Sequence, residues 1–293
     1  MLELVKVNRS FGQKAVLNDV SFKVDSGRLT GFVGANGAGK TTTMRIILGV
    51  LSADSGRVTY QGAPVDGSVR SRIGYMPEER GLYPKMKVAE QLVYLARLHG
   101  LNPSRARSNS DLLIQELGLE GKANSQIETL SLGNQQRAQI AASLVHDPEI
   151  LVLDEPFSGL DPLAVDSVQG VLKRKASTGA PVLFSSHQLD VVERLCDDLV
   201  VIADGSIRAA GTKQALQAEF GTSSFEIETE KELDWLNKMK GVTVTKSEGT
   251  RAAFNADQES AQEVLRLALS KGSVTKFAPK RPTLSEIFKE VIG

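Results

Sequence analysis

The sequence is short of four features, and each shortage excludes a class of protein. Its 293 residues include one cysteine, Cys196, which excludes an internal disulfide and fits a reducing compartment. Its 35 basic and 35 acidic residues cancel, so no overall field attracts nucleic acid or an anionic membrane surface. No stretch approaches the roughly 18 consecutive apolar residues that a membrane-spanning helix needs. The first residues, MLELVKVNRSFG, lack the charged head and apolar run of a signal peptide. We therefore expect a soluble, cytoplasmic protein that reaches a membrane only through a partner.

Strand and helix patterns alternate along roughly the first 220 residues. Two strands, within 149–156 and 180–187, are continuously apolar, as in a parallel sheet covered on both faces, and a helix over 163–177 separates them. The segment from about 85 to 148 instead has helical spacing. Further expected elements are strands over 2–8 and 20–24 with a turn over 11–19 between them, a strand over 28–34 and a helix over 41–51. This order predicts an α/β domain over residues 1–220, with a parallel sheet, an antiparallel β subdomain and a helical subdomain.

The pattern changes again from about residue 223. The expected elements are a strand in FEIETE, a short helix in KELDWLNKMKG, a hairpin through VTVTKSEG and TRAAFNA, a long helix in SAQEVLRLALSKG and a terminal helix in LSEIFKEVIG. This succession predicts a small α+β domain over residues 223–293. It contains no cluster of metal-ligand residues, so the sequence assigns it no chemistry of its own.

Residues 34–41 read GANGAGKT and fit the phosphate-binding pattern G-x-x-x-x-G-K-[ST]. Glycines let the backbone wrap closely around phosphates, so that successive N–H groups point at them. Lys40 adds a positive charge near the β- and γ-phosphates, and the Thr41 hydroxyl is placed to coordinate Mg²⁺. The expected nucleotide-binding residues of this loop are Gly34, Asn36, Gly37, Gly39, Lys40, Thr41 and Thr42. The loop predicts binding of a nucleoside triphosphate.

Two adjacent acids, Asp154 and Glu155, follow the apolar run Ile150–Leu153. Because parallel strands present ligands at their carboxyl ends, we expect both acids beside the phosphates. Asp154 is expected to hold Mg²⁺ together with Thr41. Glu155 is the candidate base that orients and deprotonates the attacking water; the alternative is an exposed acid at the end of a strand.

Taken together, these motifs resemble the nucleotide-binding subunit of an ABC transporter over residues 1–220. The run LSLGNQQR (130–137), which leads into a helix expected over 135–145, resembles the family's signature motif, which in that family meets the γ-phosphate of ATP held by a second subunit. The resemblance implies a P-loop NTPase fold, ATP and Mg²⁺ as ligands, and two chains facing head to tail with two ATP molecules between them. It also implies that Ser131 and Gly133 contact the neighbour's phosphate.

The same resemblance assigns three more residues. Phe11 matches the aromatic that stacks on adenine, although it could instead be a core residue of the first hairpin. Asp161, in the run SGLD (158–161), matches the loop through which the two sites communicate. His187 matches the histidine that contacts the γ-phosphate, which makes it a catalytic candidate with Lys40 and Glu155.

Three residues depart from the family pattern. Leu132 and Asn134 stand in the signature where glycine and glutamine are usual. Glu78, in IGYMPE, stands where a glutamine usually contacts Mg²⁺ or water, so it is a candidate nucleotide and metal ligand that adds negative charge. With the run ERGLYPKMKV and the ending PTLSEIFKEVIG, these features resemble the ATPase subunits of ABC-2-type exporters of the sodium- and antibiotic-efflux group.

The resemblance also implies partners. They are a second ATPase subunit, here a homodimer, and an integral-membrane permease that would hold the chain at the inner face of the cell membrane. Residues of about 78–100 are the expected permease contact, where LVYLARL (92–98) is either a docking groove or the apolar face of a core helix. The C-terminal domain could be a regulatory ligand module, an extra dimer contact or a permease brace. Two other functions stay open: a soluble, non-transport ABC ATPase, which the neutral charge and the lack of a tandem cassette disfavour, and an ATP-dependent switch with little turnover.

Overall fold

The computed structural model describes residues 1–220, 224–280 and 283–292, which form two compact units. The first comprises Met1–Lys213 and the second Gln214–Val291. The start and end expected for the C-terminal domain, residues 223 and 293, lie outside the described residues. Among the residues described, no helix is long and apolar enough to cross a membrane.

A six-stranded sheet forms the centre of the first unit, in the order β10-β9-β3-β8-β7-β6. Five neighbouring strands run parallel, and β10 pairs antiparallel with β9 at one edge. The strands are β3 (Leu29–Val33), β6 (Ile73–Met76), β7 (Ile150–Leu153), β8 (Val182–Ser186), β9 (Asp198–Ala203) and β10 (Ser206–Thr212). Every residue of β3, β7, β8 and β9 is buried, which confirms the parallel sheet expected from the apolar runs.

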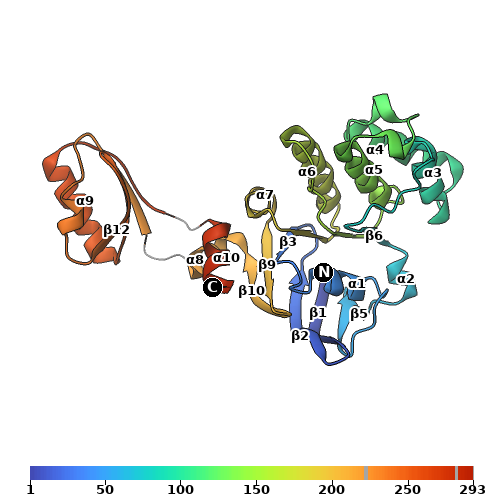
Figure 1. Ribbon diagram of the computed structural model, residues 1–293, viewed down its shortest axis with the longest axis horizontal. Coiled ribbons are helices and arrows are strands. Elements are labelled where there is room, and N and C mark those ends of the chain that lie inside the picture. Colours follow the sequence, from blue (N-terminus) through green and yellow to red (C-terminus); the bar gives the residue numbers. More distant parts are fainter. Residues whose placement is uncertain (221–223, 281–282, 293) are drawn as a thin grey trace. The chain divides into compact units, whose positions relative to one another are not determined.

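A four-stranded antiparallel sheet, in the order β2-β1-β4-β5, packs over α1 (Lys40–Ile47) and the parallel sheet in one apolar core (Figure 1). Its strands are β1 (Leu2–Phe11), β2 (Lys14–Val24), β4 (Ser55–Tyr60) and β5 (Ala63–Pro64). The long turn expected over 11–19 is wrong, because β1 and β2 pair as far as Phe11 and Lys14. Register shifts in β1 break the alternation on which that expectation rested. The helix expected to reach residue 51 ends at Ile47.

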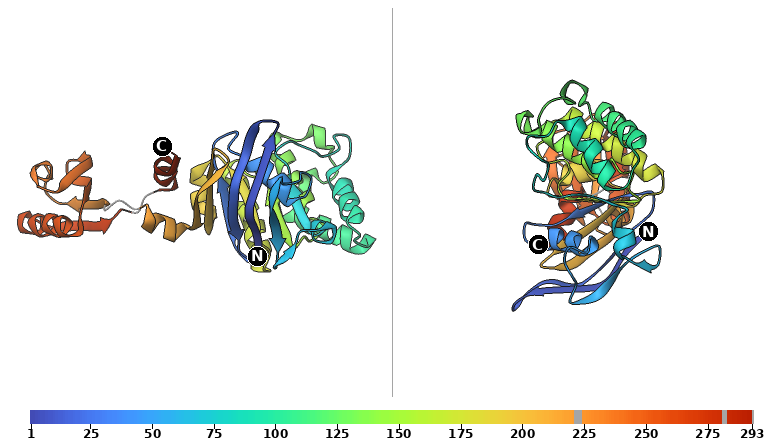
Figure 2. Two further views of the ribbon diagram at one scale, coloured as in Figure 1. Left: turned by 90° about the horizontal axis from the view of Figure 1, so that it is seen from below. Right: turned by 90° about the vertical axis from the view of Figure 1, so that its right-hand side faces the viewer.

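Helices lie on the other side of the parallel sheet, as Figure 1 and the right-hand view of Figure 2 show. They are α3 (Val88–Leu98), α4 (Pro103–Glu116), α5 (Leu132–Leu144), α6 (Pro162–Ser177) and α7 (Leu189–Leu195). The first three pack on one another and make the helical subdomain. Asn102 caps α4, whose first residue is proline, so the sequence sets the start of that helix locally. The short α2 (Gly67–Arg70) precedes β6.

The second unit contains a four-stranded antiparallel sheet in the order β12-β13-β11-β14, with α9 (Gln258–Lys271) on one face. Its strands are β11 (Ser224–Thr229), β12 (Val242–Glu248), β13 (Arg251–Ala256) and β14 (Val274–Pro279), and its other helices are α8 (Lys213–Glu219) and α10 (Leu284–Ile292). The helix expected in KELDWLNKMKG is only a 3-10 turn over Leu236–Lys238, because its apolar residues anchor a loop in the core of the sheet and α9.

Candidate functional site

The phosphate-binding loop joins the end of β3 to the start of α1. Gly39 lies at φ 109° as the N-cap of α1, and Gly37 has φ 82°, both in the left-handed region that favours glycine. At Gly34 a Cβ would stand 2.4 Å from the Ile202 carbonyl oxygen, so the loop passes too close to β9 for a side chain. The backbone conformation at Gly37 and Gly39 and the close approach at Gly34 therefore require glycine at these positions. The loop leads into the N-terminus of a helix, which is a favourable place to bind an anion.

Lys40 is held inside this loop by the loop's own backbone. Its Nζ donates to the Gly34 carbonyl at 2.6 Å and to the Ala35 carbonyl at 3.2 Å. Burial lowers the pKa of the Lys40 ammonium, and the nearby carboxylates of Glu155, Asp154 and Glu78 oppose that shift. The ammonium is therefore positioned as a fixed positive group, and phosphate oxygens are better partners for it than neutral carbonyls.

The two acids after β7 are held by a serine on the neighbouring strand. Asp154 accepts hydrogen bonds from Thr41 Oγ1 at 2.9 Å and from Ser185 Oγ at 2.5 Å. The same Ser185 oxygen accepts from the backbone N–H of Glu155 at 2.8 Å. Asp154, Glu155 and Ser185 are all buried, so these bonds leave the acids little freedom of position.

Glu155 combines a strained backbone with a polar contact. Its φ is 51°, a value that costs a non-glycine residue of the order of 1 kcal/mol or more and often marks a functional site. Its Oε2 lies 2.9 Å from Nδ1 of His187, whose side chain is 57% exposed against 11% for that of Glu155. The structure thus places the expected base and the expected histidine in direct contact, with the histidine on the solvent side.

An open cleft of about 630 Å³ lies over the phosphate-binding loop. Its lining residues are Phe11, Lys14, Ala15, Val16, Asn36, Gly37, Gly39, Lys40, Thr41, Thr42, Glu78, Asp154, Glu155, Asp204 and Gly205. Most of the expected nucleotide and metal ligands of this subunit therefore share one cleft. Gly34 shapes the loop beneath it.

Phe11 stands at the tip of the β1–β2 hairpin, at one side of this cleft. Its side chain is 49% exposed, which excludes the alternative of a core residue. The Arg9 guanidinium lies 4.8 Å from the ring centroid. An exposed aromatic ring beside a phosphate-binding loop is suited to stack on a planar base.

The signature residues lie on another part of the same unit, away from the lining of the cleft. Ser131 is the N-cap of α5 and accepts from the backbone N–H of Asn134, so the helix begins at Leu132 and the expected start at Gln135 is wrong. The Gly133 position has room for a Cβ 3.4 Å from the Gly159 carbonyl. Asp161 caps α6 by accepting from the N–H of Ala164 at 2.9 Å. Ser131 and Gly133 therefore present a helix N-terminus beside the loop that leads to Asp161.

The structure also brings into the site residues that the sequence did not single out. Lys14, Val16 and Asp204 line the cleft, and Ser185 holds both acids. In the sequence Ser185 differs from the adjacent Ser186 by nothing except its position on the strand. Only the pairing of β7 with β8 turns Ser185 toward Asp154.

The donors at the centre of the cleft fit a magnesium ion. Thr41 Oγ1 and Asp154 Oδ2 are already within hydrogen-bond distance of each other, and both are the hard oxygen ligands that Mg²⁺ prefers. Glu78 lines the same cleft. In the described parts of the chain, no group of three or more His, Cys, Asp or Glu residues is placed to hold a metal ion.

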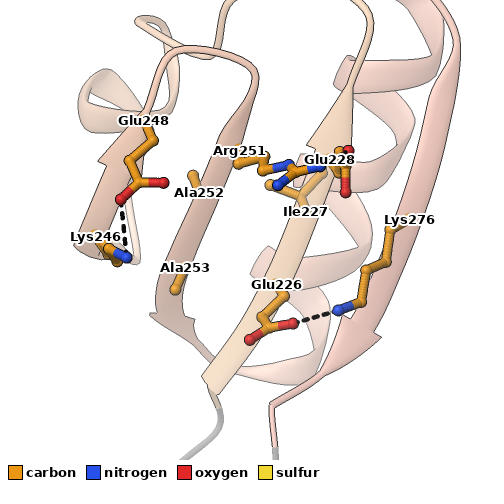
Figure 3. Close-up of a pocket in the computed structure, with 9 residues that line it drawn as sticks. All are labelled: Glu226, Ile227, Glu228, Lys246, Glu248, Arg251, Ala252, Ala253 and Lys276. Carbon is orange, nitrogen blue, oxygen red and sulfur yellow. Dashed lines mark hydrogen bonds and ion pairs between the residues drawn. The ribbon is translucent and has the colours of Figure 1, made fainter.

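A second, smaller cleft of about 300 Å³ lies on the sheet face of the C-terminal unit that α9 leaves uncovered (Figure 3). Its charged residues already pair with one another: Glu226 with Lys276 at 2.6 Å, Glu248 with Lys246 at 2.8 Å and Glu228 with Arg251 at 2.8 Å. Such a neutralised face contains no unpaired group that would select a charged ligand.

Comparison with known proteins agrees with this geometry. Residues 17–158 match the ABC transporter family, and residues 211–292 match the C-terminal domain of DrrA1-3-like ATP-binding proteins. The chain is 37% identical, over 100% of its length and 99% of the relative's, to the uncharacterized ABC transporter ATP-binding protein YhaQ of Bacillus subtilis. It is 36% identical to the Nod factor export ATP-binding protein I of Paraburkholderia xenovorans, over 77% of this chain and 76% of that one.

A solved structure of an ATP-binding subunit of an ABC transporter superposes with a TM-score of 0.70. It is 32% identical and covers 75% of this chain and 93% of its own. The family resemblance inferred from the sequence is thereby confirmed, as is the ABC ATPase fold. The chain belongs to the ATP-binding proteins of ABC transporters and is a nucleotide-binding subunit of that family.

Proposed function

We propose that this subunit hydrolyses ATP and thereby drives a separate membrane permease that exports its substrate. The observation that carries the proposal is a cluster of hydrogen-bonded residues beside the phosphate-binding loop. The cluster consists of Thr41, Asp154, Ser185 and Glu155. It puts a metal-binding pair and a buried carboxylate at one end of the cleft that holds Lys40.

In this proposal each residue has a separate task. The loop amides and Lys40 bind the triphosphate and offset its charge, while Phe11 stacks on the base. Mg²⁺ bound at Thr41 and Asp154 would neutralise charge on the β- and γ-phosphates. Glu155 orients a water molecule and takes its proton, and the contact with His187 keeps the Glu155 carboxylate pointing into the cleft.

We further propose that the site is completed by a second copy of the chain. Ser131 and Gly133 offer a hydroxyl and helix N–H groups to an anion, yet they do not line the cleft of their own subunit. A head-to-tail homodimer would let each signature bind the γ-phosphate held by the other chain. Asp161 and its loop lie next to the signature and would link the two sites.

The permease contact is proposed for the exposed aromatic surface beside the helical subdomain. Tyr83 and Tyr94 are exposed, their rings meet edge to face at 6.1 Å, and with Met86 they line a shallow groove. Of LVYLARL, Leu92 and Ala96 are buried in the core, whereas Tyr94 and Leu98 face solvent. The buried residues of the segment support its role as a core helix, and its exposed residues are the ones for which we propose the permease contact.

Export is the proposed direction, because the chain resembles a Nod factor export ATP-binding protein over 77% of its length. The subunit would then work on the cytoplasmic side of the cell membrane, attached through the permease.

The test is phosphate release from Mg²⁺-ATP by the wild type, Glu155→Gln and Lys40→Ala. We expect Glu155→Gln to bind ATP with little change and to lose at least about 100-fold in rate, because it removes the base alone. Lys40→Ala should lose binding as well. A wild type that binds ATP with no turnover above that of Glu155→Gln would refute the proposed hydrolysis and favour an ATP-dependent switch.

A further inference from the structure

Two glutamines one turn apart on α5 reach into the two loops that carry the acids of the cleft. Gln136 Nε2 donates to the Glu155 carbonyl at 2.9 Å and to the Pro156 carbonyl at 3.1 Å. Gln139 Nε2 donates to the Pro77 carbonyl at 2.7 Å and to the Glu79 carbonyl at 3.1 Å. Residues three apart share a helix face, so one face of α5 holds the backbone at both loops.

The contacts of Gln139 bracket Glu78. They tie the carbonyl groups of the residues before and after Glu78 to the signature helix, while the Glu78 side chain lines the cleft. Both bonds use the amide nitrogen, which is therefore fully occupied in holding the loop.

The burial of Gln139 adds a second indication. The residue is 4% exposed, and its buried Oε1 has no hydrogen-bond partner among the residues that the structure describes. A buried acceptor without a partner costs roughly 1–3 kcal/mol. An apolar residue of the same size would avoid that cost, so the amide at this position does not serve stability alone.

We propose that Gln139 is a positioning residue of the ATPase reaction: it fixes the loop that carries Glu78 to the signature helix. Gln136 and Gln139 together make α5 a rigid link. One end of the link is the signature surface proposed to meet the partner's ATP, and the other is the pair of loops that carry Glu78 and Glu155. A shift of α5 when Ser131 and Gly133 engage the partner's phosphate then moves Glu78 and Glu155 together. This inference rests on the proposed hydrolysis and dimer.

The first test measures the loop itself, without nucleotide. Hydrogen exchange of the amides of residues 78–82 is compared in the full-length wild type and in Gln139→Leu, which keeps the side-chain volume and removes both donors. We expect exchange of these amides to be about tenfold faster in the variant, because two bonds of ordinary strength are lost. Unchanged exchange in this loop would overturn the inference.

The second test is a double-mutant cycle in Mg²⁺-ATP hydrolysis. Gln139→Leu should lower kcat about tenfold and change the Kd for ATP less than twofold, because the phosphate-binding loop is untouched. In a Glu78→Ala background the same substitution should have little further effect on kcat, since the residue that it positions is gone. Additive effects of the two substitutions would show a general structural role and would overturn the proposal.

The matched control is Gln91→Leu on α3. Gln91 is also buried, in the helical subdomain, and its Oε1 likewise has no hydrogen-bond partner in the described part of the chain. This control should leave kcat and the exchange of residues 78–82 unchanged. If Gln139→Leu does not fold, Gln139→Asn, whose shorter amide cannot span both carbonyls, replaces it with the same expected outcome. A wild type without turnover would refute the proposed hydrolysis, whereas an active wild type with an unaffected variant refutes the positioning role alone.

Discussion

Removing the Ser185 hydroxyl is predicted to damage both stability and turnover. Ser185→Ala deletes one oxygen, yet that oxygen donates to Asp154 Oδ1 at 2.5 Å and accepts from the Glu155 N–H at 2.8 Å. All three residues are buried, so solvent cannot replace either bond. The substitution therefore leaves a buried carboxylate oxygen and a buried N–H group without their partner.

The expected loss of stability follows from these two bonds. A hydrogen bond to a charged group contributes about 1.5–3 kcal/mol, and a buried N–H left unpaired costs about 1–3 kcal/mol. The Thr41 hydroxyl still satisfies the other Asp154 oxygen, so we take the lower half of each range. Ser185→Ala should therefore lower the free energy of unfolding by about 3 kcal/mol. Turnover should fall at least about tenfold, because Asp154 and Glu155 lose their common anchor.

The assays are urea unfolding followed by far-ultraviolet circular dichroism, and phosphate release at saturating Mg²⁺-ATP. Ser186→Ala is the matched control, since Ser186 is as buried and only caps a local turn by accepting from the Gln188 N–H at 3.0 Å. We expect it to cost about 1 kcal/mol and to leave turnover within about threefold. Equal effects of the two substitutions on turnover would refute the anchoring role of Ser185.

Three further substitutions test other parts of the account. Phe11→Ala should weaken ATP binding about tenfold by equilibrium titration, because base stacking contributes about 1–3 kcal/mol; unchanged affinity would contradict the stacking role. Gly34→Ala should lower the free energy of unfolding by about 1–3 kcal/mol, since its Cβ would meet the Ile202 carbonyl at 2.4 Å, whereas Gly170→Ala, with open space, should not. Burial and the stacked His99 lower the pKa of His146 to about 4 from 6.5. The unfolded chain therefore takes up the proton first, and stability should fall by up to about 3 kcal/mol between pH 6.5 and 4. His146→Leu should remove that loss, and an unchanged pH profile would contradict it.

Much of the cleft could be predicted because its residues form local motifs. The phosphate-binding loop needs glycines at fixed spacing before a lysine, and the acids Asp154 and Glu155 directly follow an apolar strand. Parallel pairing then brings these segments together, since β3 and β7 both pair with β8. The spacing of the motifs and the rule that parallel strands present ligands at their carboxyl ends are together sufficient to place Lys40 beside Asp154.

The contacts that hold the site were beyond sequence reasoning, because they join residues far apart in the chain. Ser185 is 31 positions from Asp154, and Gln139 is 62 from Pro77. Either side chain could equally have been an ordinary buried polar group. The end of β1 and the start of β2 were misplaced for a related reason, since register shifts that β2 and β4 accommodate do not follow a period of two.

The central claim is that two copies of this chain close on ATP with each signature completing the other copy's site. The most direct measurement is the solution mass of Glu155→Gln by light scattering, with and without Mg²⁺-ATP. Because we expect this variant to bind ATP without hydrolysing it, the account predicts a monomer that becomes a dimer with ATP, and Ser131→Arg in the same background should remain monomeric. A Glu155→Gln protein that is saturated with ATP and remains a monomer would contradict the claim.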